Sequence, residues 1–216
     1  MTCPYDFILF DLDGTLSDPI DGIGRSINYA LEHFAYAPLD HAQQAICIGP
    51  PLYHSFARIT GSTDEAHLTA LIDKYRERYG SVGYAENQLY PGIAEALQAL
   101  SAQGVPMAVC TSKRADFAER ILDMFGIAEH FRFVDGGDIH LEKWQQIERL
   151  RARGIVTEAS LMVGDRDVDM IAAQRNGLSA AGVLWGYGSR AELSAFAPEH
   201  LFSAASELVQ LLAPLS

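Results

Sequence analysis

Two carboxylates that follow an apolar run near the start of the chain could take part in acid–base or metal chemistry. Asp11 and Asp13 come directly after the run Phe7–Phe10 and are two positions apart. In an extended chain residues i and i+2 point to the same side, so both carboxylates could face one point. An ordinary strand-end turn, in which Asp and Gly are common, also accounts for the pair.

A second acidic cluster follows the run Leu161–Val163. It consists of Asp165, Asp167 and Asp169. Acidic residues in the first turn of a helix interact favourably with the helix dipole, which accounts for the two later carboxylates but not for Asp165. A calcium-binding EF-hand loop is excluded, because its sixth position would be Met170 instead of Gly.

Hydroxyl and ammonium groups follow a third apolar run, Met107–Cys110. Thr111, Ser112 and Lys113 stand there, just before a predicted helix. Hydroxyls and backbone N–H groups at a helix start can bind phosphate, although Ser112 as a plain N-cap fits equally well. Lys143, at the start of another predicted helix, is a further candidate, and a lone lysine is equally typical of a solvated surface.

Short apolar runs alternate with helical patterns over most of the chain. The predicted strands are Phe7–Phe10, Met107–Cys110, Phe131–Val134, Leu161–Val163 and Ala180–Leu184. The predicted helices between them are Gly92–Ala102, Ala115–Phe125, Lys143–Arg153 and Val168–Asn176. This alternation predicts an α/β fold with a Rossmann-like parallel sheet covered on both faces.

One segment interrupts the alternation directly after the first strand. Three amphipathic helical patterns follow one another there, at Ile20–Phe34, Leu52–Ile59 and Ala66–Tyr79. We therefore expect a small all-helical cap of residues 17–85 inserted into an α/β core of residues 1–16 and 86–216.

The polar clusters are expected to meet, because the carboxyl ends of parallel strands lie at one edge of the sheet, where such folds bind ligands. Carboxylates with room for water suit Mg²⁺, which would also neutralise charge as a phosphate approaches. Phosphoryl transfer needs little beyond a nucleophile, a general acid and cations.

Composition limits the partners. The formal net charge is −12, which argues against nucleic acid and anionic membranes. No apolar run is long enough to span a membrane, and no signal peptide is recognisable. Three scattered cysteines suggest free thiols and a cytoplasmic location. A small-molecule ligand is expected, and the sequence leaves open a monomer or a homodimer.

Four motifs in order along the chain resemble those of the haloacid dehalogenase (HAD) superfamily. They are DLDGTL at 11–16, CTSK at 110–113, the lysine at 143 and GDRDVD at 164–169. The stretches FDLDGTLSDPIDGIGRSINYAL, IGPPL, YPGI and GVLWGYGSRAEL are similar to the phosphoglycolate phosphatase-like subgroup, and the resemblance covers nearly the whole chain.

The resemblance implies a role for each matching residue. Asp11 would be the nucleophile that forms an aspartyl-phosphate, and Asp13 would be the general acid and base. Mg²⁺ would be held by Asp11, the carbonyl of Asp13 and Asp165, with Asp169 in support. Phosphate would be bound by Gly14, Thr111, Ser112 and Lys143. Independently of the resemblance, the loop Ile48–His54 leads rigidly into a helix and could cover the site, so His54 is a candidate substrate contact.

The third motif departs from the family pattern. Lys143 is followed by Trp144 instead of Pro, and His140 stands where relatives carry Arg, so the placement of Lys143 is the open question. His54 and Arg58, four residues apart, could share a helix face, and a plain surface face is the alternative for Arg58.

Rival functions match the sequence less well. A dehalogenase would carry an aromatic residue at Asp13, a hexose-phosphate mutase would show a His and an Ala-Trp pair early in the cap, and a phosphonate hydrolase would need a cap lysine, for which only Lys74 is available. Gly186–Ala191 matches a dinucleotide-binding pattern, but it comes late in the fold without the acidic residue that should follow.

The sequence therefore predicts a Mg²⁺-dependent phosphomonoester hydrolase acting on a small metabolite. 2-Phosphoglycolate is the first candidate substrate, and nucleoside monophosphates are the second. A non-catalytic protein that binds a phosphorylated ligand is the alternative from a different class.

Overall fold

A parallel sheet occupies one half of the protein. The computed structural model describes residues 3–138 and 141–213. The strand order is β5-β4-β1-β6-β7-β8, and all neighbours run parallel. The strands are β1 (Ile8–Phe10), β4 (Met107–Thr111), β5 (Val134–Gly136), β6 (Leu161–Gly164), β7 (Ser179–Val183) and β8 (His200–Phe202).

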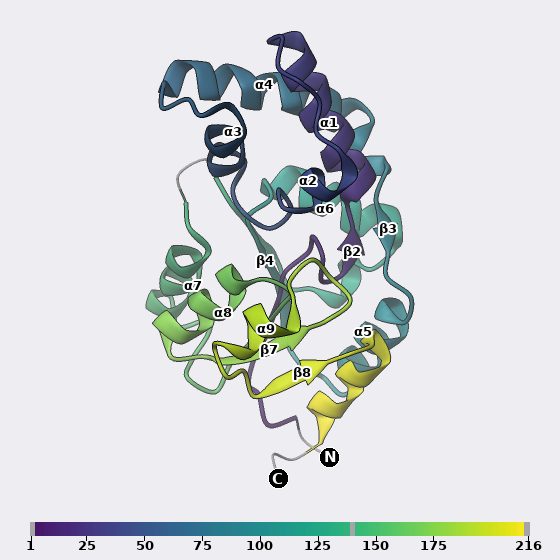
Figure 1. Ribbon diagram of the computed structural model, residues 1–216. Coiled ribbons are helices and arrows are strands. Elements are labelled where there is room, and N and C mark those ends of the chain that lie inside the picture. The colour runs from purple at the N-terminus through teal and green to yellow at the C-terminus, as the bar shows by residue number, and fades with distance from the viewer. Residues whose placement is uncertain (1–2, 139–140, 214–216) are drawn as a thin grey trace.

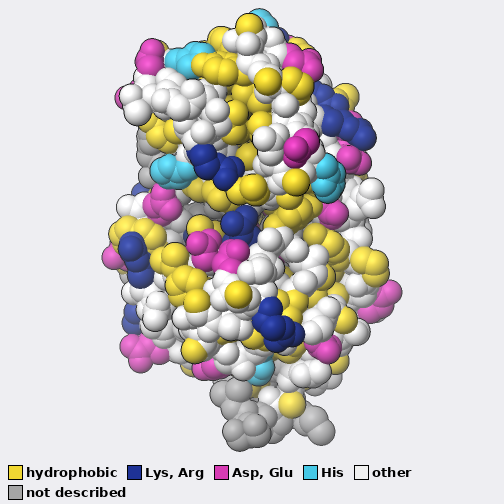
Figure 2. All heavy atoms as spheres, in the orientation of Figure 1, with side chains coloured by type: hydrophobic (Ala, Val, Ile, Leu, Met, Phe, Trp, Pro, Cys, Tyr) yellow, Lys and Arg dark blue, Asp and Glu magenta, His cyan; other side chains and the backbone are white. Residues whose placement is uncertain are grey.

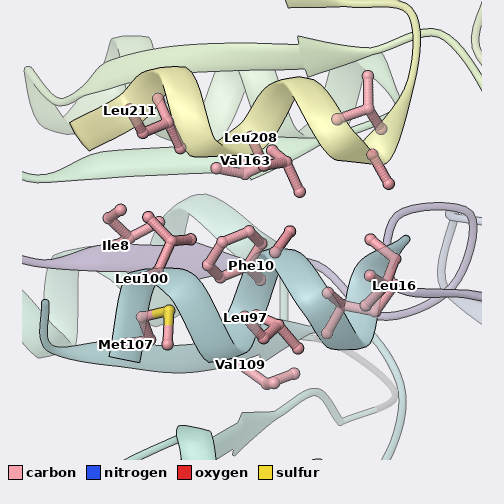
Figure 3. Packing of buried hydrophobic residues seen from close by; sticks show 14 of the residues in the cluster. Ile8, Phe10, Leu16, Leu97, Leu100, Met107, Val109, Val163, Leu208 and Leu211 are labelled. Atoms are coloured by element: carbon pink, nitrogen blue, oxygen red, sulfur yellow. The ribbon is translucent and has the colours of Figure 1, made fainter. Parts of the chain in front are cut away.

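Helices cover both faces of this sheet (Figure 1). They are α5 (Ile93–Ala102), α6 (Ala115–Phe125), α7 (Lys143–Ala152), α8 (Asp167–Asn176), α9 (Arg190–Ser194) and the 3₁₀ helices η2 (Ala128–His130) and η3 (Ala205–Leu212). Side chains of β1 alternate between the faces. Ile8 and Phe10 pack towards α5 and η3 (Figure 3), whereas Leu9 packs with α7 and α8.

A second group of helices packs around another apolar cluster, to which Phe117 of α6 also contributes. The group comprises α1 (Ile20–His33), α2 (His41–Ala45), α3 (Leu52–Thr60), α4 (Glu65–Ser81) and η1 (Gly83–Ala85). Ile27, Phe56 and Leu68 are fully buried within it. Figure 1 places α1, α3 and α4 at the opposite end of the molecule from the two termini. The antiparallel pair β2 (Ser17–Asp18) and β3 (Gln88–Leu89) brackets this helical segment.

The predicted fold class is confirmed, and one predicted strand is wrong. β5 occupies Val134–Gly136, whereas the apolar pattern predicts Phe131–Val134. The register pairs Val134 with Val109 and extends the strand over Asp135 and Gly136, which carry no apolar signal. The two-residue strands β2 and β3, the edge strand β8, and the short helices α2 and α9 are also absent from the prediction.

Candidate active site

Three adjacent strands bring the predicted polar residues to one edge of the sheet. β1 lies between β4 and β6, and its last residue, Phe10, is in register with Val109 and Val163. Asp11 follows β1, Asp165 follows β6, and Thr111 is the last residue of β4. All three side chains are buried. The order of the strands therefore brings together residues that are far apart in the sequence, such as Asp11 and Asp165, which are 154 positions apart.

Lys143, the residue whose placement the sequence leaves open, reaches this edge from the first turn of α7. Its Nζ lies 2.9 Å from Oδ1 of Asp11 and donates a 2.5 Å hydrogen bond to Oδ1 of Asp169. Burial alone would lower the pKa of Lys143, but the Asp11 and Asp169 carboxylates outweigh it and raise that pKa. His140, at which the third motif also departs from the family pattern, lies outside the described residues.

Asp165 is held in place by neutral donors. Thr15 Oγ1 donates to Oδ1 at 3.2 Å, and the backbone N–H of Tyr187 donates to Oδ2 at 2.8 Å. The chain must approach closely here, because a Cβ on Gly14 or Gly186 would lie 2.3 Å and 2.5 Å from this carboxylate. Burial, followed by the Asp169 and Asp11 carboxylates, raises the pKa of Asp165 well above its ordinary value.

The donor set fits a hard metal cation. Asp11, Asp165 and Asp169 each offer a carboxylate oxygen, and these oxygens lie within 4.8 Å of one another. Asp169 is engaged through both oxygens, by Lys143 and by the N–H of Arg166 at 3.0 Å, which suits support better than direct ligation. Lys143 pairs with Asp11 and Asp169 but not with Asp165, so negative charge is in excess at the cluster. Oxygen ligands of this kind suit Mg²⁺ or Ca²⁺.

Asp13 points to a different partner than Asp11 does. Its Oδ2 lies 2.8 Å from Nζ of Lys113, and its Oδ1 has no hydrogen-bond partner among residues 3–138 and 141–213. Burial raises the pKa of Asp13, and the Lys113 ammonium acts in the opposite direction without cancelling that effect. The two carboxylates that the sequence presents as a pair therefore stand in different environments.

The predicted phosphate-binding residues Thr111 and Ser112 stand at the end of β4 and directly after it. Thr111 Oγ1 accepts a hydrogen bond of 3.2 Å from the N–H of Lys113, which forms a tight turn before α6. The buried side chain of Gln146 on α7 donates a 3.2 Å hydrogen bond to the carbonyl of Thr111 and so ties the end of β4 to α7. Ser112 is half-buried and lines the cavity described next.

A cavity lies between the sheet edge and the helical segment. Its floor includes Asp13, Ser112 and Lys113, and its other walls include the loop of residues 49–52 and the α4 side chains Tyr75, Arg76 and Tyr79. Figure 2 shows acidic and basic side chains together in a hollow between the upper and lower parts of one face. The cavity can take a ligand whose polar end meets the carboxylates while the remainder meets aromatic side chains.

His54 does not line this cavity. Its Nε2 lies 3.0 Å from a carboxylate oxygen of Glu142, and both side chains are about half exposed. Arg58 donates to the sulfur of Cys47 at 3.4 Å, so the two residues have different partners. Sequence reasoning missed the roles of Thr15, Lys113, Gln146 and Tyr187. Lys113 stands inside a recognised motif, but its two partners come from segments far away in the sequence.

Sheet order and acidic site together define an α/β enzyme of the phosphoryl-transfer kind. The family model described as haloacid dehalogenase-like hydrolase matches residues 8–183. The chain is 39% identical to a 5'-nucleotidase of Pseudomonas aeruginosa over 96% of both chains, and 31% identical to a phosphoglycolate phosphatase of Aquifex aeolicus over 95% of both. The crystal structure of a predicted phosphatase from Clostridium acetobutylicum superposes with a TM-score of 0.91 at 33% identity, covering 98% of this chain and 99% of the other.

The chain thus belongs to the haloacid dehalogenase-like hydrolases, and it is a phosphatase of that superfamily. Its relatives include enzymes named for two different small phosphorylated substrates. In the described part of the chain, no helix is both long enough and apolar enough to cross a membrane.

Proposed function

We propose that this protein hydrolyses phosphomonoesters through an aspartyl-phosphate formed on Asp11. The observation that carries the proposal is a pair of buried carboxylates in different settings. Asp11 lies against Lys143, whereas Asp13 lines the cavity and its Oδ1 has no hydrogen-bond partner among the described residues. A carboxylate oxygen of Asp11 attacks phosphorus while the bond to the leaving oxygen breaks, and Asp13 gives that oxygen a proton. Water then attacks phosphorus, its proton passes to Asp13, and Asp11 and inorganic phosphate are released.

The proposal includes Mg²⁺ as the metal. Asp11, Asp165 and the backbone carbonyl of Asp13 would hold it, and it would neutralise charge between nucleophile and phosphate. Asp169 orients Lys143, which is supported by their 2.5 Å hydrogen bond. Thr111 and the N–H of Ser112, with Lys143 and the backbone at Gly14, would bind the phosphoryl oxygens.

The substrate is a small phosphorylated metabolite, and two classes compete. The sequence ranks 2-phosphoglycolate first, and the cations Arg76 and Arg114 at the cavity would suit its carboxylate. Tyr53, Tyr75, Tyr79 and Phe117 also line the cavity, and aromatic faces suit a nucleobase. These side chains, together with the 5'-nucleotidase relative, favour nucleoside monophosphates over 2-phosphoglycolate as the substrate.

We further propose that residues 17–85 form a cap that closes over a core of residues 1–16 and 86–216. The apolar cluster of this segment, which Phe117 of α6 also joins, and the position of the segment across the cavity support this division. His54 would then act at the rim through Glu142, outside the substrate site.

An Asp11→Asn variant tests the reaction. Phosphate release is measured with and without Mg²⁺ on a panel that contains 2-phosphoglycolate and the nucleoside monophosphates. We expect turnover to fall at least about 1,000-fold, because the variant lacks the attacking carboxylate. Asp123→Asn, an exposed change on α6, is the matched control and should turn over normally. Undiminished turnover by Asp11→Asn would refute the proposal.

A further inference from the structure

The ammonium of Lys113 joins the helical segment to the sheet edge. Its Nζ lies 2.8 Å from Oδ2 of Asp13 and donates a 2.6 Å hydrogen bond to the hydroxyl of Tyr79 on α4. The same Nζ lies 4.4 Å from the centre of the Tyr79 ring. Only 6% of the Lys113 side chain is exposed, so water competes little for these contacts.

Tyr79 is itself fixed by its neighbours. Its ring stacks on Tyr75 at 5.2 Å between centroids and 13° between planes. Phe117 of α6 meets it edge-on, also at 5.2 Å between centroids. Tyr79 is 1% exposed. The hydroxyl that holds Lys113 therefore has a defined position in space.

The hydroxyl and the ring of Tyr79 hold the Lys113 ammonium in place, and the ammonium in turn holds Oδ2 of Asp13. The second oxygen, Oδ1, is buried and has no hydrogen-bond partner in the described part of the chain, and Asp13 lines the cavity. When Asp13 is protonated at Oδ1, its Oδ2 still accepts from Lys113. The carboxyl group can therefore carry a transferable proton without losing its orientation.

We infer that Lys113 is a positioning residue for proton delivery, and that Tyr79 holds Lys113 for this task. Lys113 turns Oδ1 of Asp13 towards the leaving oxygen of the substrate, and α4 thereby contributes to the chemistry at the sheet edge. The inference rests on the proposed roles of Asp11 and Asp13. It adds a residue from the helical segment to a reaction otherwise carried by the strand ends.

The leaving group provides a test. An aliphatic alcohol leaves poorly and needs a proton, whereas p-nitrophenolate leaves without one. Lys113→Met is compared with the unchanged protein in single-turnover cleavage of the best aliphatic substrate of the panel and of p-nitrophenyl phosphate. We expect a loss of about tenfold or more for the aliphatic ester and of less than about threefold for the aryl ester.

Two further variants make the test specific. Tyr79→Phe keeps the stacked ring and loses only the hydroxyl, so it should show the same bias with a smaller loss. Lys74→Met is the matched control for Lys113→Met. Lys74 lies on α4, as Tyr79 does, but its ammonium stands over the ring of Tyr29 and pairs with Glu77 on the surface. The control should change neither rate.

Cleavage of the aryl ester also reports that each variant is folded. An equal loss for both esters would overturn the inference. So would weaker substrate binding with an unchanged maximal single-turnover rate, which would mark Lys113 as a substrate-binding residue. Failure of the proposed function would look different, because Asp11→Asn would then still cleave p-nitrophenyl phosphate.

Discussion

The buried charges at the sheet edge differ in whether they have a partner. Lys143 lies between Asp11 and Asp169, so its charge is compensated on two sides. Asp165 has only neutral hydrogen-bond donors and no ion-pair partner among the described residues. A buried carboxylate without a cation destabilises the folded state. The charge of Asp165 therefore favours metal binding but lowers the stability of the metal-free protein.

We expect Asp165→Asn to stabilise the metal-free protein while weakening metal binding. The amide keeps the size of the carboxylate and can still accept from Tyr187 and donate to Thr15, but it carries no charge. Melting is measured in a chelator, and a rise of about 3 °C corresponds to roughly 1 kcal/mol for a chain of this size. With added Mg²⁺ the order should reverse, because the unchanged protein gains stability from binding. A lower melting temperature in the chelator would contradict this reading.

The same substitution has a pH signature. Burial, followed by the Asp169 and Asp11 carboxylates, raises the pKa of Asp165 above 3.8 in the folded state. The folded protein therefore keeps a proton that the unfolded chain has lost, and stability falls as pH rises from about 4 through the folded pKa. Asparagine does not titrate, so the advantage of the variant in chelator should be absent near pH 3.5 and grow towards neutral pH.

At the scale of elements, Arg166 connects the start of α8 to the loop that forms one cavity wall. Its Nη1 donates a 2.6 Å hydrogen bond to the carbonyl of Ile48, and its Nε donates at 2.9 Å to Glu192 on α9. Gly49 packs against this side chain, since a Cβ there would lie 2.9 Å from Cγ of Arg166. Arg166, at the start of α8, therefore holds the cavity wall of residues 49–52 in place.

Arg166→Met should release that wall. We expect KM for the best substrate to rise about tenfold and kcat to change little, because binding is weakened while Asp11 and Asp13 keep their surroundings. Steady-state kinetics measure both constants. Arg190→Met, an exposed arginine at the start of α9, is the control and should match the unchanged protein. A fall in kcat with constant KM would show that Arg166 acts on the chemistry instead.

At the scale of the whole molecule, the helical segment enters and leaves at neighbouring points. β2 and β3 pair antiparallel, with Asp18 opposite Gln88. The apolar cores on the two sheet faces include no side chain of α1 to α4. A two-residue Asn-Gly turn could therefore join Asp18 to Gln88 in place of residues 19–87.

We expect this shortened chain to unfold cooperatively and to lose substrate selectivity. The strand ends would keep Asp11, Thr111 and Asp165, and α7 would keep Lys143, so hydrolysis of p-nitrophenyl phosphate should persist at a reduced rate. The aromatic side chains of α4 would be gone, so kcat/KM should become similar across metabolites. Denaturant unfolding and the substrate panel measure the two expectations, and retained selectivity would place the specificity residues in the core.

The sequence determined the fold class and predicted which candidate site residues should meet. Apolar runs of strand length report burial directly, and three of them are followed by polar clusters. The carboxyl ends of parallel strands lie at one edge of a sheet, so the sequence predicts that Asp11, Thr111 and Asp165 meet there. The positions of β5 and β8 did not follow, because edge strands include polar residues that carry no apolar pattern. Two-residue strands such as β2 are too short for any pattern.

Only the tertiary structure decided which partner each charged side chain has. The sequence predicts different roles for Asp11 and Asp13 but not the cation beside each of them, and in the structure Lys143 lies against Asp11 and Lys113 against Asp13. The sequence ranks His54 as a substrate contact, whereas the helix places it against Glu142. Spacing along a strand or helix fixes the direction of a side chain relative to its own element. Contacts between elements depend on how these pack, and packing is a property of the whole chain.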